Sequence, residues 1–309
     1  MISRDVKAFL RAARALAPDF GPATASAAFM VAPDGFARAE ESARDNAYMA
    51  DVDRFDPLRA LLQHRALHVA VSGTVPTICF AGRVDTPDAL FPNNVFATAP
   101  GRVVVGRMRH PVRQREAART DIREFFTSVL GLELHDLSGQ AHPCELTGAL
   151  VIDRARGIGW CGLSERCDEA GARSMHAAFG LRATLMFDLA PGEYHTNVLL
   201  ALLAGRAALV CPEGIADPQV VDALDAVYGP GVIRLTPVEH RAFVANAISL
   251  NADTVWMSGS AERAMTALTR AALADAGFGI ASVELDAIEA AGGSLRCCVG
   301  EIFLSGAGT

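Results

Sequence analysis

Two adjacent cysteines near the end of the chain, Cys297 and Cys298, carry side chains that could do chemistry. They stand in "GGSLRCCVGEIF", residues 292–303, after a double glycine and beside Arg296. Glycines permit a tight turn and a close backbone approach to a ligand. A neighbouring arginine favours the thiolate, the reactive form of cysteine. The stretch is therefore a candidate for a cysteine nucleophile, but a packing role is the commoner outcome for such residues, since most free cysteines are small core residues.

A cysteine nucleophile needs a base, and the chain offers eight histidines. His195 stands in "GEYHTNVLL", where a polar cluster meets an apolar run. That position suits a partly desolvated imidazole, which can shuttle protons near neutral pH. Glu145, in "CELTGALVID", precedes an apolar run and can orient the histidine or hold substrate N–H groups. The alternatives are a hydrogen-bonded core histidine and a solvated turn glutamate.

Four further polar residues are candidates for substrate binding. Asn93 and Asn94 lie in "DALFPNNVFAT", where asparagines are typical of turns but can also point their amides at a ligand. Arg113 and Arg166 can each clamp a carboxylate with two parallel hydrogen bonds. Ordinary surface arginines would look the same in the sequence.

Composition excludes several classes of partner. Hydrophobic residues make up 51% of the chain and charged residues 20%, which is typical of a globular protein with a packed core. The formal net charge of −7 argues against a nucleic-acid or anionic-membrane binder, because phosphates attract basic surfaces. We see no apolar run of membrane-spanning length. The expected partner is therefore a small molecule, and the oligomeric state, including a homo-oligomer, stays open.

The cysteine count and the first residues bear on location. Seven cysteines at irregular spacings, without a secretion signal, predict reduced thiols and a cytoplasmic protein rather than a disulfide framework. Their spacing also fails to predict a metal site. The first residues are amphipathic and basic, but Asp5 and Asp19 interrupt the pattern of a transit peptide. We expect a surface helix there.

Short apolar runs alternate with helical patterns, which predicts a single α/β domain. The stretch "VIDRARGIGWCG", residues 151–162, predicts a hairpin, so its G-x-G-x-x-G is set aside as a nucleotide-binding motif. Strands are also predicted over residues 66–73 and from Cys297 onward. On a strand, only one of two adjacent cysteines can face a given pocket. Helices are predicted over residues 56–64, 120–130, 168–179, 217–228, 237–247 and 260–274.

Together these fragments resemble a known family. The matching pieces, in chain order, are "FMVAPDGF", "DNAYM", "DALFPNNVFAT", "CELTGALVIDRARGIGWCGLSER", "EYHTNVLL", "VANAI" and "AGGSLRCCVGEIFL". They are similar to the guanidino-modifying pentein superfamily, which includes arginine deiminases, dimethylarginine dimethylaminohydrolases and amidinotransferases. The nearest branch is the one that includes citrulline-hydrolysing enzymes.

The resemblance implies a pentein α/β-propeller, with five ββαβ-like units around a pseudo-fivefold axis and an active site in the central channel. Residues 27–309 would form a single catalytic domain, preceded by an N-terminal helical extension over residues 1–26. By position, the resemblance makes Cys297 the nucleophile, His195 the general acid and base, and Glu145 the acidic residue of the site. No metal or organic cofactor is implied. Arg113 and Arg166 match the arginines that bind the substrate α-carboxylate.

The chain departs from the family pattern where arginine deiminases surround the guanidinium with carboxylates. Thr98 and Ala99 stand in place of the first carboxylate, Asn197 in place of the second and Gly148 in place of the third. Glu145 alone remains. A buried guanidinium without paired carboxylates faces a desolvation penalty of several kcal/mol.

A neutral ureido group needs no such counter-charge, and the amides of Asn93, Asn94 and Asn197 suit its C=O and N–H groups. The sequence thus favours a citrulline-type substrate, with arginine and methylarginine as alternatives if other carboxylates replace the missing ones. The predicted activity is cysteine-dependent hydrolysis of a C–N bond through a covalent S-linked intermediate. Capture of that intermediate by an amine would make an amidinotransferase. A non-catalytic binder of arginine-like amino acids is the third reading.

Overall fold

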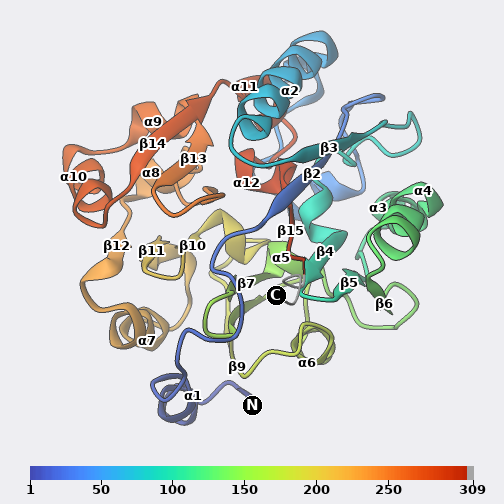
Figure 1. Cartoon of the computed structure of the whole chain (residues 1–309). Helices are drawn as coiled ribbons and strands as arrows, with labels where there is room; N and C mark the ends of the chain where they lie inside the picture. The colour runs from blue at the N-terminus through green and yellow to red at the C-terminus, as the bar shows by residue number, and fades with distance from the viewer. Residues whose placement is uncertain (305–309) are drawn as a thin grey trace.

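The computed structural model describes residues 1–304, in which the strands form five separate sheets (Figure 1). The four-stranded sheet has the order β1 (Ile2–Ser3), β9 (Ala183–Asp188), β8 (Ile158–Leu163) and β7 (Leu150–Asp153), and the two-stranded sheet contains β13 (Thr254–Ser258) and β14 (Gly279–Val283). Two three-stranded sheets have the orders β10 (Leu200–Leu203), β11 (Ala207–Val210), β12 (Val232–Arg234) and β15 (Gly300–Ile302), β2 (Ala27–Val31), β3 (Thr77–Phe80). The third three-stranded sheet has the order β4 (Phe96–Ala99), β5 (Arg102–Val105), β6 (Glu133–Asp136).

Four of these sheets share one pairing pattern, an antiparallel pair followed by a parallel strand. The pairs β4–β5, β7–β8, β10–β11 and β15–β2 are antiparallel, and β6, β9, β12 and β3 respectively add in parallel. In the remaining sheet β13 and β14 are parallel, and Ile248 forms an isolated antiparallel bridge with Trp256 of β13. Four of the five sheets therefore repeat one small unit, and the fifth contains only a parallel pair of strands.

Helices connect and cover these strands (Figure 1). They are α1 (Val6–Ala13), α2 (Pro57–Ser72), α3 (Pro111–Ala117), α4 (Thr120–Glu124), α5 (Leu146–Ala149), α6 (Glu169–Ala178), α7 (Gln219–Tyr228), α8 (Pro237–Arg241), α9 (Gly259–Ala264), α10 (Ala267–Asp275), α11 (Asp286–Glu289) and α12 (Leu295–Cys298). The 3₁₀-helical turns are η1 (Ser42–Asp45), η2 (Val52–Arg54), η3 (Pro92–Asn94), η5 (Thr196–Val198), η6 (Pro212–Gly214) and η7 (Gly229–Gly231), and η4 (Phe125–Val129) is a π-helical turn.

The predicted hairpin is confirmed, because β7 and β8 pair antiparallel around its polar turn. The strand predicted over residues 66–73 is wrong, since α2 runs on to Ser72. Its buried residues Ala60, His64, Leu67 and Val71 recur every three or four positions, so this apolar run has the period of a helix.

Three other predicted elements need correction. The strand expected from Cys297 starts only at Gly300, because the two cysteines close the short helix α12. The helix predicted over residues 237–247 stops at Arg241, and Phe243 has a φ of 64°, which does not continue a helix. The helix predicted over residues 260–274 is interrupted, and Thr266 caps the start of α10.

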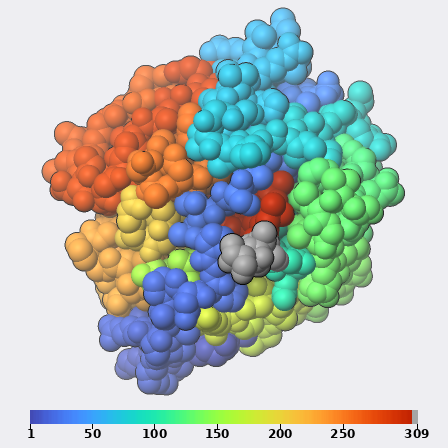
Figure 2. Space-filling model, viewed as in Figure 1, coloured from blue at the N-terminus to red at the C-terminus, as the bar shows by residue number. Residues whose placement is uncertain are grey.

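The first residues pack onto the body of the protein. Strand β1 pairs in parallel with β9, and α1 lies against β9 and α7 at one edge of the molecule (Figures 1 and 2). Phe9 is fully buried, and its ring meets the Trp160 ring edge-on with centroids 5.1 Å apart. The division between residues 1–26 and 27–309 stays a prediction. In the described part of the chain, no helix combines the length and apolar character needed to cross a membrane.

Candidate active site

The candidate site is built at one recurring point of the fold, just before the first strand of a sheet. Asn93 and Asn94 precede β4, Glu145 precedes β7, and the same relation holds for His195 with Asn197 before β10 and for Cys297 before β15. The short helical turns at these points contact one another, as η3 does with α5 and α12. Residues far apart in sequence therefore meet in one place.

A small pocket, with about 300 Å³ of space between its atoms, opens at this point. We call it the front pocket and define it by the polar side chains that line it: Cys297, His195, Arg113, Arg166, Asp88 and Asn94. Five of these six side chains were predicted from the sequence, whereas Asp88 was not.

Cys297 is 3% exposed and two amides approach its sulfur. Asn246 donates its Nδ2–H to Cys297 Sγ at 3.3 Å, and Asn197 Nδ2 lies 3.9 Å from the same sulfur. Burial raises the pKa of the Cys297 thiol above its ordinary value, although the Asn246 hydrogen bond and the Arg296 charge oppose that rise. The resting group at neutral pH is therefore the thiol. Its neighbour Cys298 is fully buried in the apolar core.

The double glycine before Cys297 is required by the local geometry. Gly292 has a φ of 76°, which is the left-handed region, and a Cβ there would lie 2.4 Å from Asn46 Nδ2. Its carbonyl accepts hydrogen bonds from Tyr194 Oη and Asn46 Nδ2. Glycine thus lets this loop close against the front pocket.

His195 and Glu145 form a buried pair. His195 Nε2 lies 2.9 Å from Glu145 Oε2, while the backbone N–H of Arg109 donates to the other carboxylate oxygen at 3.1 Å. Burial raises the pKa of Glu145, but the Arg166 charge, 3.5 Å away, and the His195 hydrogen bond outweigh it, so this pKa lies below its usual range. Burial also lowers the pKa of His195, although Glu145 opposes that shift. Glu145 is thus ionised and His195 neutral at rest.

Gly148, one of the departures from the family pattern, has a physical reason in this structure. A Cβ at this position would lie 2.7 Å from both Cε1 and Nδ1 of His195. No side chain fits there while the imidazole keeps this place. Thr98, another departure, points into the sheet, where its hydroxyl donates to the Glu301 carbonyl at 2.9 Å and accepts from the Phe303 N–H at 2.8 Å.

Both predicted arginines are buried and already paired with carboxylates. Arg113 Nε and Nη2 donate to the two oxygens of Glu116 at 2.9 and 2.8 Å, and Nη2 also donates to Asn94 Oδ1 at 3.0 Å. Arg166 donates to Asp45 Oδ1 at 2.5 Å from Nη2. These pairs fix the guanidinium planes at the wall of the front pocket.

Asp88 is a site residue that the sequence reasoning missed. Ser42 Oγ donates to Asp88 Oδ2 at 2.6 Å, whereas Oδ1 has no partner among the described residues. Burial raises the pKa of this carboxyl, and the nearby charges of Arg113 and Arg166 oppose the rise. The signal was available, since Asp88 opens the same "DALFPNNVFAT" stretch that supplied Asn94.

Asn246 was missed for a different reason, because it lies in the segment predicted to be helical. Asn93, by contrast, was predicted as a site residue, but the front pocket is lined by its neighbour Asn94 instead. The Asn93 side chain is buried, and neither of its polar atoms has a partner within the described part of the chain. Its role in binding stays a prediction. Across residues 1–304, no three His, Cys, Asp or Glu side chains are grouped as metal ligands.

A comparison with protein-family models now identifies the chain. The model described as eukaryotic N,N dimethylarginine dimethylhydrolase matches residues 32–304. The chain belongs to this family. The resemblance to guanidino-modifying enzymes is thereby confirmed, and the chain is a cysteine-dependent hydrolase that cleaves a C–N bond of a ureido or guanidino amino acid. No curated protein matches it in sequence.

Solved structures show the same fold. The N-terminal domain of ArgZ, a cyanobacterial arginine dihydrolase crystallised with its substrate, superposes with a TM-score of 0.79 at 20% identity, covering 90% of this chain and 99% of that one. The ternary complex of AgrE with ornithine and NAD⁺ gives 0.79 at 19% identity, covering 89% of this chain and 39% of that one.

A third match is the dimethylarginine dimethylaminohydrolase adduct with S-methyl-L-thiocitrulline. It gives a TM-score of 0.70 at 18% identity and covers 90% of this chain and all of that one. At such identities the likeness establishes the mixed α/β fold of these enzymes. The substrate of this chain has to be argued from its own side chains.

Proposed function

We propose that this hydrolase acts on a ureido amino acid of the citrulline type. The observation that carries the proposal is the chemistry around Cys297 Sγ, where the polar side chains in contact are the amides of Asn246 and Asn197. The nearby carboxylate, Glu145, is already engaged by His195, Arg109 and Arg166. A neutral ureido group is satisfied by amides, whereas a guanidinium would lack a counter-charge.

The other end of the front pocket suits the head group of an amino acid. Arg113 and Arg166 present guanidinium groups to a substrate α-carboxylate. Asp88 turns a carboxyl oxygen without a partner toward the same region, and its pKa responds to both arginines. We assign this carboxyl to the substrate α-ammonium, so that a zwitterion finds both of its charges matched.

The reaction then follows from proton transfers within the site. The Cys297 thiol gives its proton to His195, and the thiolate attacks the ureido carbon to form a C–S bond. The imidazolium, stabilised by Glu145, donates its proton to the departing amine or ammonia as the C–N bond breaks. Water deprotonated by His195 then attacks the S-linked carbon, the C–S bond breaks and the thiol regains a proton.

The finer description of the fold is part of this proposal. The five small sheets support five ββαβ-like units around a pseudo-fivefold axis, since four share one pairing pattern and the Ile248–Trp256 bridge completes the fifth. Residues 27–309 form the single catalytic domain, and residues 1–26 are a helical extension packed onto it. The partner is a small amino acid in the cytoplasm, and the mechanism needs no metal or organic cofactor.

The test is a mass-spectrometric product assay with citrulline, arginine, dimethylarginine and guanidino acids offered separately. Ornithine formed from citrulline by the wild-type protein, and not by Cys297→Ser, supports the proposal. Citrulline formed from arginine or dimethylarginine, with citrulline itself inert, contradicts it. Transfer of the carbon group to an added amine would make the protein a transferase.

A further inference from the structure

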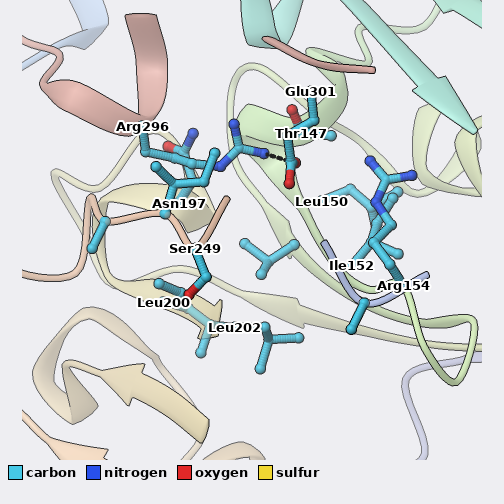
Figure 3. Close-up of a pocket in the computed structure, with 15 residues that line it drawn as sticks. Thr147, Leu150, Ile152, Arg154, Asn197, Leu200, Leu202, Ser249, Arg296 and Glu301 are labelled. Carbon is cyan, nitrogen blue, oxygen red and sulfur yellow. Dashed lines mark hydrogen bonds and ion pairs between the residues drawn. The ribbon is translucent and has the colours of Figure 1, made fainter. Parts of the chain in front are cut away.

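A second pocket lies behind the nucleophile, and of its lining only Asn197 takes part in the proposed function. It has about 500 Å³ of space between its atoms. We call it the rear pocket and define it by six side chains that line it: Arg154, Arg296, Glu301, Ser249, Leu200 and Asn197. Figure 3 shows the Arg296–Glu301 ion pair on one side, Arg154 across from it and aliphatic side chains between and below them.

The rear pocket contains a buried cation, Arg154, that makes no direct ion pair within residues 1–304, although the charge of Glu301 in the same lining raises its pKa. The Arg154 side chain donates to the Thr98 carbonyl at 2.9 Å and its guanidinium lies 4.4 Å from the centre of the Phe303 ring. In residues 1–304, no carboxylate oxygen comes within 4.0 Å of this guanidinium, whereas Arg296 pairs with Glu301 at 2.7 Å. Burial lowers the pKa of Arg154 to about 10, which reflects the cost of an unpaired buried charge. An anion would offset that cost.

An independent feature points to a ligand in the same place. Ser249 is 5% exposed, lines the rear pocket and leaves its hydroxyl without a partner within the described chain. Buried hydroxyls are normally hydrogen-bonded. Leu150, Leu200 and Leu202 face the same space (Figure 3), and Thr147 and Asn197 add polar groups to the wall. The lining thus offers an unpaired cation, a hydroxyl donor and an apolar surface, beside the Arg296–Glu301 ion pair.

The rear pocket is connected to the nucleophile through three of its lining residues. Arg296 directly precedes Cys297, and its positive charge lowers the thiol pKa. Asn197 lies close to the sulfur, and Ser249 is three residues from Asn246, which donates to it. The charged or titratable groups around Cys297 are Arg296, Cys298 and the pocket residues Arg113, Arg166, Asp88, His195 and Tyr194. Of these, Arg296 alone lines the rear pocket.

We propose that the rear pocket binds a short-chain aliphatic carboxylate and that its binding makes Cys297 less reactive. The carboxylate lies between Arg154 and the Ser249 hydroxyl, and the aliphatic chain packs on the leucines. The bound anion partly cancels the positive field of Arg296, which disfavours the thiolate. The proposal goes beyond the hydrolase activity and does not depend on which substrate the front pocket takes.

Binding is tested by calorimetry with butyrate, formate and the neutral isostere butyramide, at constant ionic strength. We expect butyrate to bind more tightly than formate, and butyramide not to bind. Arg154→Gln should lose butyrate binding, and Ser249→Ala should weaken it without disturbing the fold. Arg206→Gln is the matched control, because Arg206 also stacks on a phenylalanine and donates to a carbonyl, yet is exposed elsewhere. Equal affinity for formate would overturn the apolar part of the proposal.

The effect on the nucleophile is measured without turnover, as the rate at which iodoacetamide labels the Cys297 peptide. Saturating butyrate should slow labelling about threefold, because half a pKa unit changes the thiolate fraction by that factor. Arg154→Gln should abolish the slowing and Arg206→Gln should retain it. Butyrate binding that survives in Arg154→Gln, or that a saturating amino-acid substrate displaces, would place the anion in the front pocket and overturn the proposal. Because the labelling assay needs no turnover, it still tests this proposal if the protein does not hydrolyse citrulline.

Discussion

The two ends of the front pocket are built from opposite kinds of side chain. At the head-group end, the charged or ionisable groups are Arg113, Arg166 and Asp88, and each arginine is held by a carboxylate, that of Glu116 buried and that of Asp45 partly buried. At the reacting end, Cys297 is a neutral thiol, and its sulfur is approached by the amides of Asn246 and of Asn197, the latter a lining residue of the rear pocket. Recognition therefore relies on fixed charges, whereas catalysis relies on charges that must be created by proton transfer.

This difference predicts how each end responds to substitution. Removing one partner of a buried ion pair leaves the other charge uncompensated, which costs about 3–5 kcal/mol. Changes at the charged end should therefore affect both stability and substrate binding. Changes at the amide end should alter the rate and the preference for substrate with less effect on the fold.

The largest effect is expected for Cys297→Ser. Because a hydroxyl is a much weaker nucleophile, kcat should fall by about 10⁴-fold or more. Cys298→Ala is the matched control and should keep most of the activity, since Cys298 packs in the core. Steady-state kinetics check both. Similar losses in the two variants would contradict the assignment of the nucleophile.

Glu145→Gln should be the next most damaging change. The carboxylate stabilises the imidazolium, so its loss should lower kcat by about 10³-fold. Since Glu145 also raises the pKa of His195, the acid limb of the pH–rate profile should move to lower pH in the variant. An unchanged acid limb would mean that Glu145 does not act through His195.

Arg166→Lys tests the charged end. Lysine keeps the charge but loses the planar fork, so kcat/KM should fall by about 10²-fold, mainly through KM. Arg182→Lys, at an exposed pair with Asp19, is the control and should leave the kinetics unchanged. A fall confined to kcat would indicate that Arg166 serves Glu145 rather than the substrate.

A substitution among the amides near Cys297 should have the smallest effect on kcat/KM, and it should also shift the pH–rate profile. Burial lowers the pKa of His195 below 6.5 and raises that of Cys297 above 9.0, so the wild-type kcat/KM should be flat between these values. In the productive state, Cys297 and His195 together hold one proton. The pair gains a second proton on the acid limb of the profile and loses its only proton on the alkaline limb.

Asn246→Ala removes a hydrogen bond that favours the thiolate. It should move the alkaline limb to higher pH and lower kcat/KM about tenfold. Asn251→Ala is the control, because the Asn251 side chain accepts from the Thr254 N–H and makes no hydrogen bond to Cys297. An alkaline limb that does not move would show that Asn246 does not stabilise the Cys297 thiolate.

The alternation of apolar runs and helical patterns predicted the α/β class, and the family resemblance pointed to most of the lining of the front pocket, including Cys297, His195 and Arg166. Asp88 was missed although it opens the stretch that supplied Asn94, because nothing in the local sequence distinguishes a buried acidic residue before a turn from a solvated one. Asn246 was hidden by a helical pattern that ends early at Arg241. The meeting of four segments just before their strands depends on contacts far apart in the chain. Such contacts cannot be predicted from the local pattern of apolar and polar residues.

The most direct test of the central claim is competition between citrulline and arginine in one equimolar mixture, with the decay of each followed by mass spectrometry. The wild-type protein should consume citrulline first, because the reacting end has amides and no free carboxylate. Asn197→Asp should shift the ratio toward arginine. Faster consumption of arginine by the wild-type protein would contradict the claim that the reacting end of the front pocket is built for a neutral group.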